Sequence, residues 1–177
     1  MGTALAITPL KAPAPPMHTI SVLVRNQPGV LVRVALVFAR RGYNIESLVV
    51  SADVANGEFS RMTITCSGDP QTLEQIIKQL AKLIDVVHAI DHTGQSVVET
   101  EIALVKIQSD LKSRTEVLQV AEHYNAKVVD YGAEALIVRV YGDTEKLDSF
   151  ISLLRPLGVV ELVRSGKILM ARGPQTT

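Results

Sequence analysis

Apolar residues change their spacing several times in the first half of the chain, and each change marks a new element. The segment 18–25 is rich in β-branched residues with partial alternation, which is typical of a strand. Further on, Leu31, Val34 and Phe38 share one face of a helix. The elements expected here are, in order, a strand over 18–25, a helix over 30–41, strands over 45–54 and 58–66, a helix from residue 70 and a strand over 86–90.

Turn chemistry supports these boundaries. Asn56-Gly57 lies between the two central strands, and this dipeptide is a strong signal for a β-hairpin. Asp69-Pro70 supplies a capping carboxylate and an initial proline for the second helix. That helix carries a regular apolar stripe, which predicts an inward face made of Leu73, Ile76, Ile77, Leu80, Leu83 and Ile84.

The second half of the chain repeats this order. Residues 68–76 and 142–150 also share a signature of Gly-Asp, a spacer, Leu and then an acid. Convergence could explain a capping Asp and an inward Leu, but the common order of elements favours an internal duplication. The expected elements are a strand over 101–108, a helix over 114–124, strands over 127–131 and 135–141, a helix over 143–154 and extended segments over 159–163 and 167–171.

Two successive βαββαβ units predict an α+β protein of two tandem ferredoxin-like domains. Each unit has an antiparallel sheet with both helices on one face. The open face and the edge strands need cover, and cores of this size are small, so we expect association into dimers. The expected boundaries are a disordered leader over 1–16, domains over 17–95 and 96–172, and a tail over 173–177.

The leader does not resemble a targeting signal. It holds four of the eight prolines, and Pro9 interrupts its longest apolar stretch. A secretory signal would have an early basic residue and a longer unbroken apolar core. No apolar run in the chain approaches 18 residues, so no membrane span is expected and the predicted location is the cytoplasm.

Charge and composition exclude several further roles. The 18 basic residues balance the 18 acidic ones, so the chain lacks the positive field that drives nucleic-acid binding. The single cysteine, Cys66, cannot form a disulfide within the chain and is expected to be a small core residue.

No motif indicates catalysis. The dinucleotide, phosphate-loop, nucleophile-elbow and zinc-protease signatures are all missing from the sequence. His88 and His92 have a spacing that suits a metal on a helix, but they fall on a predicted strand and its exit, where a surface or turn role is expected. An enzymatic alternative is an acylphosphatase, because the loop before Arg33 loosely resembles the phosphate-binding loop of that family. The family's loop has Gln directly before Gly, whereas Pro28 separates Gln27 from Gly29 here.

The loop between the first strand and the first helix has the chemistry of a ligand site. Gly29 permits a close approach of the backbone, and the N–H groups of the first helical turn favour a carboxylate. The Asn44 amide can accept from an ammonium group, and Val30, Leu31 and Ile45 suit a short branched side chain. Together these groups could bind a free amino acid. An ordinary turn and helix cap explain the loop equally well.

Several motifs carry a resemblance to a known family. Asn26-x-Pro-Gly-Val-Leu, the run Arg40-Arg41-Gly42-Tyr43-Asn44-Ile45-Glu46-Ser47-Leu48 and Ser60-Arg61-Met62-Thr63-Ile64 resemble an ACT domain. With Glu101–Lys106 and Arg164-Ser165-Gly166, they resemble the regulatory (small) subunits of acetolactate synthase, over about residues 17–172.

This resemblance implies a regulatory protein rather than an enzyme. It would bind and activate a thiamine-diphosphate-dependent catalytic subunit and confer feedback inhibition by valine in branched-chain amino-acid synthesis. No cofactor is expected in this chain, and thiamine diphosphate, Mg²⁺ and FAD would belong to the catalytic subunit. The resemblance also implies a homodimer through the ACT domains. The valine site would combine Asn26, Pro28, Gly29, Val30 and Leu31 of one protomer with Asn44 and Ile45 of the other. The alternative is a stand-alone ACT-type amino-acid sensor that regulates another protein.

Overall fold

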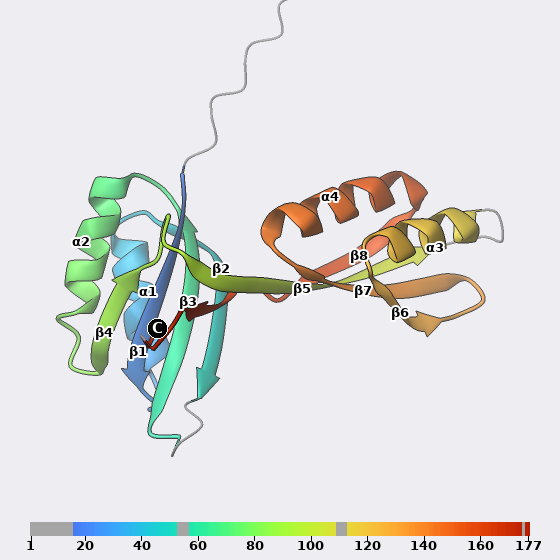
Figure 1. The fold of residues 1–177 in the computed structure, drawn as a ribbon. Helices are drawn as coiled ribbons and strands as arrows, with labels where there is room; N and C mark the ends of the chain where they lie inside the picture. Colours follow the sequence, from blue (N-terminus) through green and yellow to red (C-terminus); the bar gives the residue numbers. More distant parts are fainter. Residues whose placement is uncertain (1–15, 53–56, 109–112, 175) are drawn as a thin grey trace, which may run out of the picture.

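The protein forms two similar α+β units joined by one long strand (Figure 1). The computed structural model describes residues 16–52, 57–108, 113–174 and 176–177. The leader up to residue 15 and the predicted hairpin turn at 55–56 lie outside the described residues. Each unit contains an antiparallel sheet with two helices on one face.

The amino-terminal unit contains six elements in the expected order. Its sheet has the strand order β2-β3-β1-β4, and β1 pairs with β3 in an unbroken register from Met17 opposite Ser67 to Arg25 opposite Phe59. This is the ferredoxin-like topology. The elements are β1 (Met17–Arg25), α1 (Val30–Arg40), β2 (Asn44–Ala52), β3 (Phe59–Ser67), α2 (Pro70–Leu80) and β4 (Val86–Asp91).

The core of this unit lies between the helices and the sheet. Val30, Val34 and Phe38 face inward from α1 at intervals of four residues, which keeps them on one side of the helix. Two details of the predicted stripes are wrong. Leu31 is 43% exposed, because the inward row starts at Val30. Ile84 is 92% exposed, because α2 ends at Leu80 and the helical spacing no longer applies beyond it.

The carboxyl-terminal unit repeats this plan, so the predicted tandem of ferredoxin-like domains is confirmed. Its main sheet has the order β6-β7-β5-β8, and a further strand, β9, pairs with the beginning of β5. The elements are β5 (Val97–Gln108), α3 (Ser113–His123), β6 (Lys127–Tyr131), β7 (Ala135–Gly142), α4 (Thr144–Leu154), a short 3₁₀ turn (Arg155–Leu157), β8 (Val159–Arg164) and β9 (Ile168–Ala171).

The shared Gly-Asp signature has the same structural role in both units. The Asp69 carboxylate accepts a hydrogen bond from the Thr72 backbone N–H at 2.9 Å, and the Asp143 carboxylate accepts one from the Lys146 N–H at 2.8 Å. Each aspartate therefore caps the second helix of its unit. The residues shared between the two sequences lie at equivalent positions in the two units, as expected for an internal duplication.

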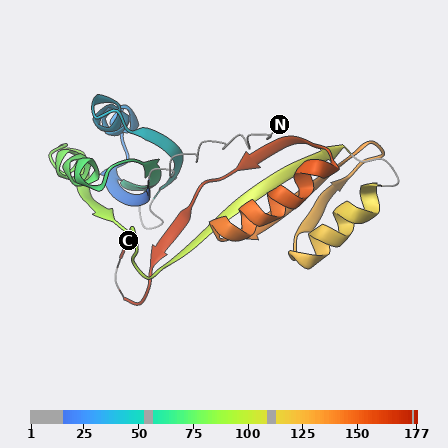
Figure 2. The same cartoon turned by 90° about the horizontal axis from the view of Figure 1, so that it is seen from above.

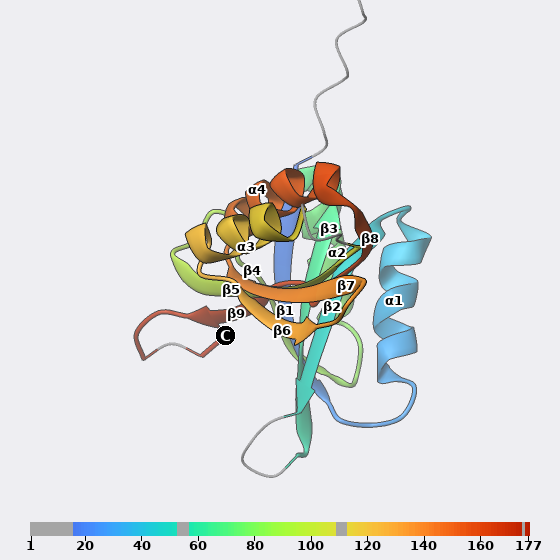
Figure 3. The same cartoon turned by 90° about the vertical axis from the view of Figure 1, so that its right-hand side faces the viewer.

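The open face of the first sheet is partly covered by the chain itself. The paired start of β5 and β9 passes over this face (Figures 1 and 3), and Figure 2 shows β5 leading from one unit into the other. A Cβ atom at Gly166, just before β9, would lie 2.8 Å from the Ser47 Cβ on β2, so the two backbones approach closely there. Thr63 and Thr65, on β3, are only 6% and 5% exposed.

Candidate ligand site

The loop between β1 and α1 turns sharply at Gly29. This residue is the N-cap of α1 and has φ 83°, a left-handed conformation that glycine adopts without a steric penalty. Among the described residues, no side chain caps the first turn of α1. The N–H groups of that turn therefore face the space beyond the helix, where they favour a carboxylate.

Asn26 fixes the other end of this loop. Its backbone N–H donates to the Glu58 carbonyl at 2.8 Å, and its side-chain Nδ2 donates to the Gly57 carbonyl at 2.9 Å. The loop is thereby attached to the start of β3. Among the described residues no hydrogen bond uses the Asn26 Oδ1, which leaves an acceptor for an ammonium group.

A small cavity adjoins this loop. Its volume is about 120 Å³, which equals the volume of about four water molecules at ~30 Å³ each. A short aliphatic side chain has this scale. Pro28 and Gly29 border the cavity through the loop but do not line it. It is lined by Val24, Arg25, Asn26, Gln27, Val30, Leu31, Val50, Ser60 and Met62. Of these nine residues, only Asn26, Val30 and Leu31 were predicted. Val24, Arg25 and Gln27 were missed on β1 and the loop, and Val50, Ser60 and Met62 were missed because they come from β2 and β3.

Asn44 and Ile45 lie far from this cavity within one chain. Asn44 begins β2, whereas the cavity adjoins the opposite end of that strand, where Ala52 pairs with Ser60. Eight steps of about 3.3 Å separate the two ends by roughly 26 Å. The Asn44 Nδ2 donates to Glu46 Oε1 at 3.1 Å. One chain therefore does not bring all seven predicted residues around a single amino acid.

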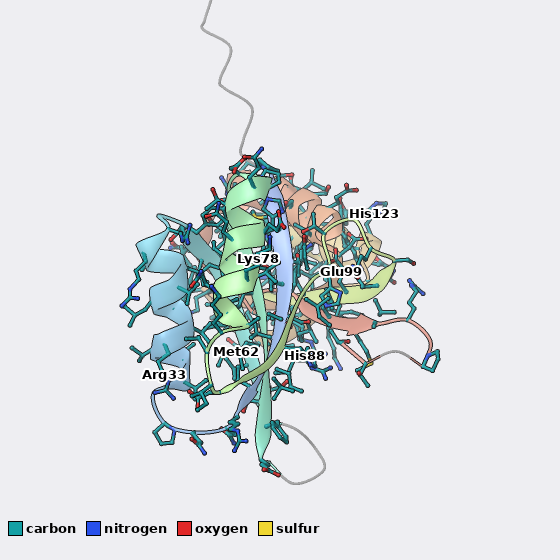
Figure 4. All side chains as sticks on the ribbon, turned by 90° about the vertical axis from the view of Figure 1, so that its left-hand side faces the viewer. Arg33, Met62, Lys78, His88, Glu99 and His123 are labelled. Atoms are coloured by element: carbon teal, nitrogen blue, oxygen red, sulfur yellow. The ribbon has the colours of Figure 1, made fainter. Side chains whose placement is uncertain are left out.

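The Arg33 side chain forms an ion pair within the chain, so its guanidinium is not free to bind a phosphate as an acylphosphatase would require. Its Nη2 lies 2.6 Å from Asp85 Oδ2, its Nε donates to the same oxygen at 2.8 Å, and the Asp85 side chain is 9% exposed. Asp85 also accepts from the Arg25 N–H through its carbonyl at 2.8 Å. Figure 4 marks Arg33 near the amino-terminal end of α1. This geometry favours a structural role for Arg33 and speaks against the acylphosphatase alternative.

The histidines have structural partners. The buried His92 Nε2 lies 2.8 Å from the Ser21 hydroxyl, and the His18 Nε2 lies 3.0 Å from the Gly68 carbonyl. His88 lies on β4 and His92 directly follows that strand, as expected. In the described part of the chain, no three His, Cys, Asp or Glu side chains are grouped closely enough to hold a metal ion. Within the same ranges, no helix has the length and apolar character needed to cross a membrane.

Cys66 is a buried core residue, as predicted. It is fully shielded from solvent, and burial, together with the nearby Asp91 and Glu46, raises the pKa of its thiol to about 11. The thiolate is the reactive form of cysteine. At pH 8, three units below this pKa, only about one thiol in a thousand is ionised. We expect the folded protein to react with 5,5′-dithiobis(2-nitrobenzoate) at least about 100-fold more slowly than the urea-unfolded chain. Equal rates in the two states would contradict this burial.

The topology and the loop together define a class of protein. Two tandem ferredoxin-like units, with a glycine turn leading into the first helix of the first unit, make this an ACT-type regulatory fold. Family models match both units, as "AHAS small subunit-like ACT domain" over residues 20–88 and "Small subunit of acetolactate synthase" over residues 100–173.

Relatives in other organisms match over most of their length. The acetolactate synthase small subunit of Mycobacterium bovis is 43% identical over 162 residues, which cover 92% of this chain and 96% of the relative. A probable acetolactate synthase small subunit of Methanothermobacter thermautotrophicus is 45% identical over 163 residues, or 92% and 96% of the two chains. The crystal structure of the small subunit from Thermotoga maritima superposes with a TM-score of 0.80 at 38% identity and covers 90% of this chain and 99% of that one. The chain belongs to the family of acetolactate synthase small subunits.

Proposed function

We propose that this protein activates the catalytic subunit of acetolactate synthase and makes it sensitive to feedback inhibition by valine. Membership of the small-subunit family supports the partnership. The cavity beside the β1–α1 loop supports an amino-acid effector. It combines a helix start for the carboxylate, the Asn26 oxygen for the ammonium group and an apolar wall for a short side chain.

One observation carries this proposal. The predicted valine-site residues lie at opposite ends of β2 within one chain, so a second chain is needed to bring them together. β2 is an edge strand of its sheet, and no other strand in the described part of the chain pairs with its outer side. If two copies paired antiparallel through β2 with Leu48 on the twofold axis, Asn44 of one chain would lie opposite Ala52 of the other. This pairing would bring the partner's Asn44 and Ile45 to the end of the sheet that holds the cavity.

Exposed apolar side chains are placed to support such a pairing. Leu31, Val32 and Leu36 on α1 are 43%, 61% and 45% exposed, and Val50 on β2 is 47% exposed. α1 lies next to the edge formed by β2. A homodimer through the ACT domains would cover part of this surface and would remove the exposed edge.

Inhibition follows if valine binds the less active arrangement of the complex more tightly. A ligand held between two chains stabilises the arrangement in which both halves of its site meet. Couplings of this kind are typically ~1–3 kcal/mol, or about 5- to 150-fold in affinity. The chemistry would remain on the catalytic subunit with its thiamine diphosphate, Mg²⁺ and FAD, while this chain supplies binding and conformational bias.

Reconstitution tests the proposal directly. The purified chain would be added to the catalytic subunit of the same organism, and acetolactate formation would be measured with and without valine. We expect a higher rate with the chain present and a fall of that rate with valine. If the chain changes neither the rate nor the valine response, but binds an amino acid and captures another protein, the stand-alone sensor is correct instead.

Asn44→Ala tests the contribution from the facing chain. We expect at least about tenfold weaker valine inhibition, because the ammonium group loses a hydrogen-bond partner worth about 1.4 kcal/mol. The dimer should persist in sedimentation analysis, since the Asn44 side chain is exposed and bonds only to Glu46 among the described groups. Gln71→Ala, at an exposed position of α2, serves as the control. Unchanged valine affinity in calorimetry would remove Asn44 from the site.

A further inference from the structure

A second and larger cleft lies between the two units, separate from the cavity at the β1–α1 loop. Its volume is about 810 Å³, within the range of small-molecule sites. The amino-terminal unit contributes one wall from β1, β2 and β3, and the carboxyl-terminal unit contributes the other from β5, the start of α4, β8 and the β8–β9 connection. The lining residues are Met17, Glu46, Ser47, Thr65, Glu99, Glu101, Asp143, Thr144, Glu145, Asp148, Arg164, Gly166 and Lys167.

Negative charge dominates this cleft. Six of the lining residues are Asp or Glu, and two, Arg164 and Lys167, are basic. Four negative charges therefore remain uncompensated within the lining. They lie on both walls, since Glu46 comes from the first unit and Glu145 from the start of α4 in the second.

Both basic residues are already engaged. Arg164 pairs with Glu101 at 2.7 Å and with Asp148 at 2.6 Å, and Lys167 pairs with Glu99 at 3.0 Å. These contacts use the cations to neutralise acids within the lining, of which Glu101 is buried, so the cations are not available to bind an anionic ligand. The charge that is left favours a cation from outside the chain.

Thr65 points to the same conclusion independently of the acids. Its neighbours Ile64 and Cys66 belong to the core beneath the sheet, so alternation along β3 directs Thr65 to the opposite face, where it lines the cleft. The side chain is 95% shielded, yet its Oγ1 has no hydrogen-bond partner among the described groups. A buried hydroxyl without a partner is unfavourable, and an amine ligand would provide the missing donor.

We propose that this cleft binds an aliphatic polyamine, with ammonium groups toward the carboxylates of both walls and one N–H donated to Thr65. A directly coordinated metal fits poorly, because no three acidic, His or Cys side chains converge closely enough among the described residues. A chain of methylene groups with an ammonium at each end matches charges that are spread over two walls. Binding would fix the two units relative to each other, and it does not depend on the valine site.

Calorimetry on the full chain with putrescine as the probe tests this proposal at moderate salt. We expect saturable binding that Thr65→Val and Glu145→Gln each weaken by about tenfold or more. Thr65→Val keeps the shape and removes only the unpaired hydroxyl, so the free protein should be at least as stable as the parent. Glu116→Gln, which alters the acid in the first turn of the exposed helix α3, is the matched control and should leave binding unchanged.

A comparison of putrescine with other cations distinguishes a specific site from nonspecific attraction of positive charge. Propylamine, with one ammonium group, should bind at least about tenfold more weakly than putrescine if both walls take part. The proposal is overturned if putrescine gives no saturable heat, if Mg²⁺ at the same ionic strength competes equally well, or if the Thr65 and Glu145 variants bind like the parent.

Discussion

Gly29→Asp should abolish valine inhibition of the reconstituted enzyme while leaving activation intact. The cap position lies where the carboxylate of the effector would meet the first turn of α1. A second carboxylate there repels the ligand and occupies the N–H groups that would bind it. We expect the inhibitory valine concentration to rise at least about 100-fold, or about 2.8 kcal/mol at 1.4 kcal/mol per tenfold. Inhibition curves at several concentrations of valine provide the measurement.

Gly29→Asn is the control that separates charge from backbone strain. Both Asp and Asn tolerate the left-handed conformation better than most residues, and the two side chains have nearly the same shape. A Cβ at this position would lie 3.4 Å from Arg33 Nη1, so either side chain meets the same neighbour. The neutral variant should retain measurable inhibition. If the Asp variant remains fully valine-sensitive, the loop is not the effector site.

The sequence predicted most of the helices and strands, because their signals come from residues that are close together along the chain. The capping aspartates, the glycine turn and the order of helices and strands along the chain follow from such signals. The exposure of Ile84 did not, since the apolar spacing continues past the point where α2 ends. A spacing of 3.6 residues identifies an inward face only while the helix persists.

Contacts between distant segments could not be predicted in this way. Asp85 holds Arg33 across 52 residues, and Gly166 meets Ser47 across the two units. No periodicity encodes such pairings, which depend on how complete elements pack. The same limit applies to the candidate site. Residue chemistry marked both Gly29 and Asn44, but only the strand register shows that they lie at opposite ends of the sheet.

Arg164→Leu should strongly destabilise the carboxyl-terminal unit. The Arg164 guanidinium donates to Glu101 Oε2 through Nη2 at 2.7 Å and through Nε at 3.1 Å. The Glu101 side chain is only 7% exposed, so removal of the cation leaves a buried carboxylate whose remaining side-chain partner among the described residues is the Thr144 hydroxyl. Burial alone would lower the pKa of Arg164, but its bonds to Asp148 and Glu101 raise that pKa, so the guanidinium stays charged at neutral pH.

We expect the free energy of unfolding to fall by about 3 kcal/mol, the lower end of the range for breaking a buried pair, because Arg164 remains 29% exposed. Urea unfolding followed by circular dichroism measures this change. Lys78→Met, which breaks the exposed pair with Glu74 on α2, should have a much smaller effect.

The double variant Arg164→Leu with Glu101→Gln decides whether the loss arises from the uncompensated charge. If it does, neutralising Glu101 should restore more than half of the lost stability, since the amide can still accept from Thr144. If the double variant is as unstable as Arg164→Leu alone, the guanidinium acts through packing of its stem rather than through the pair.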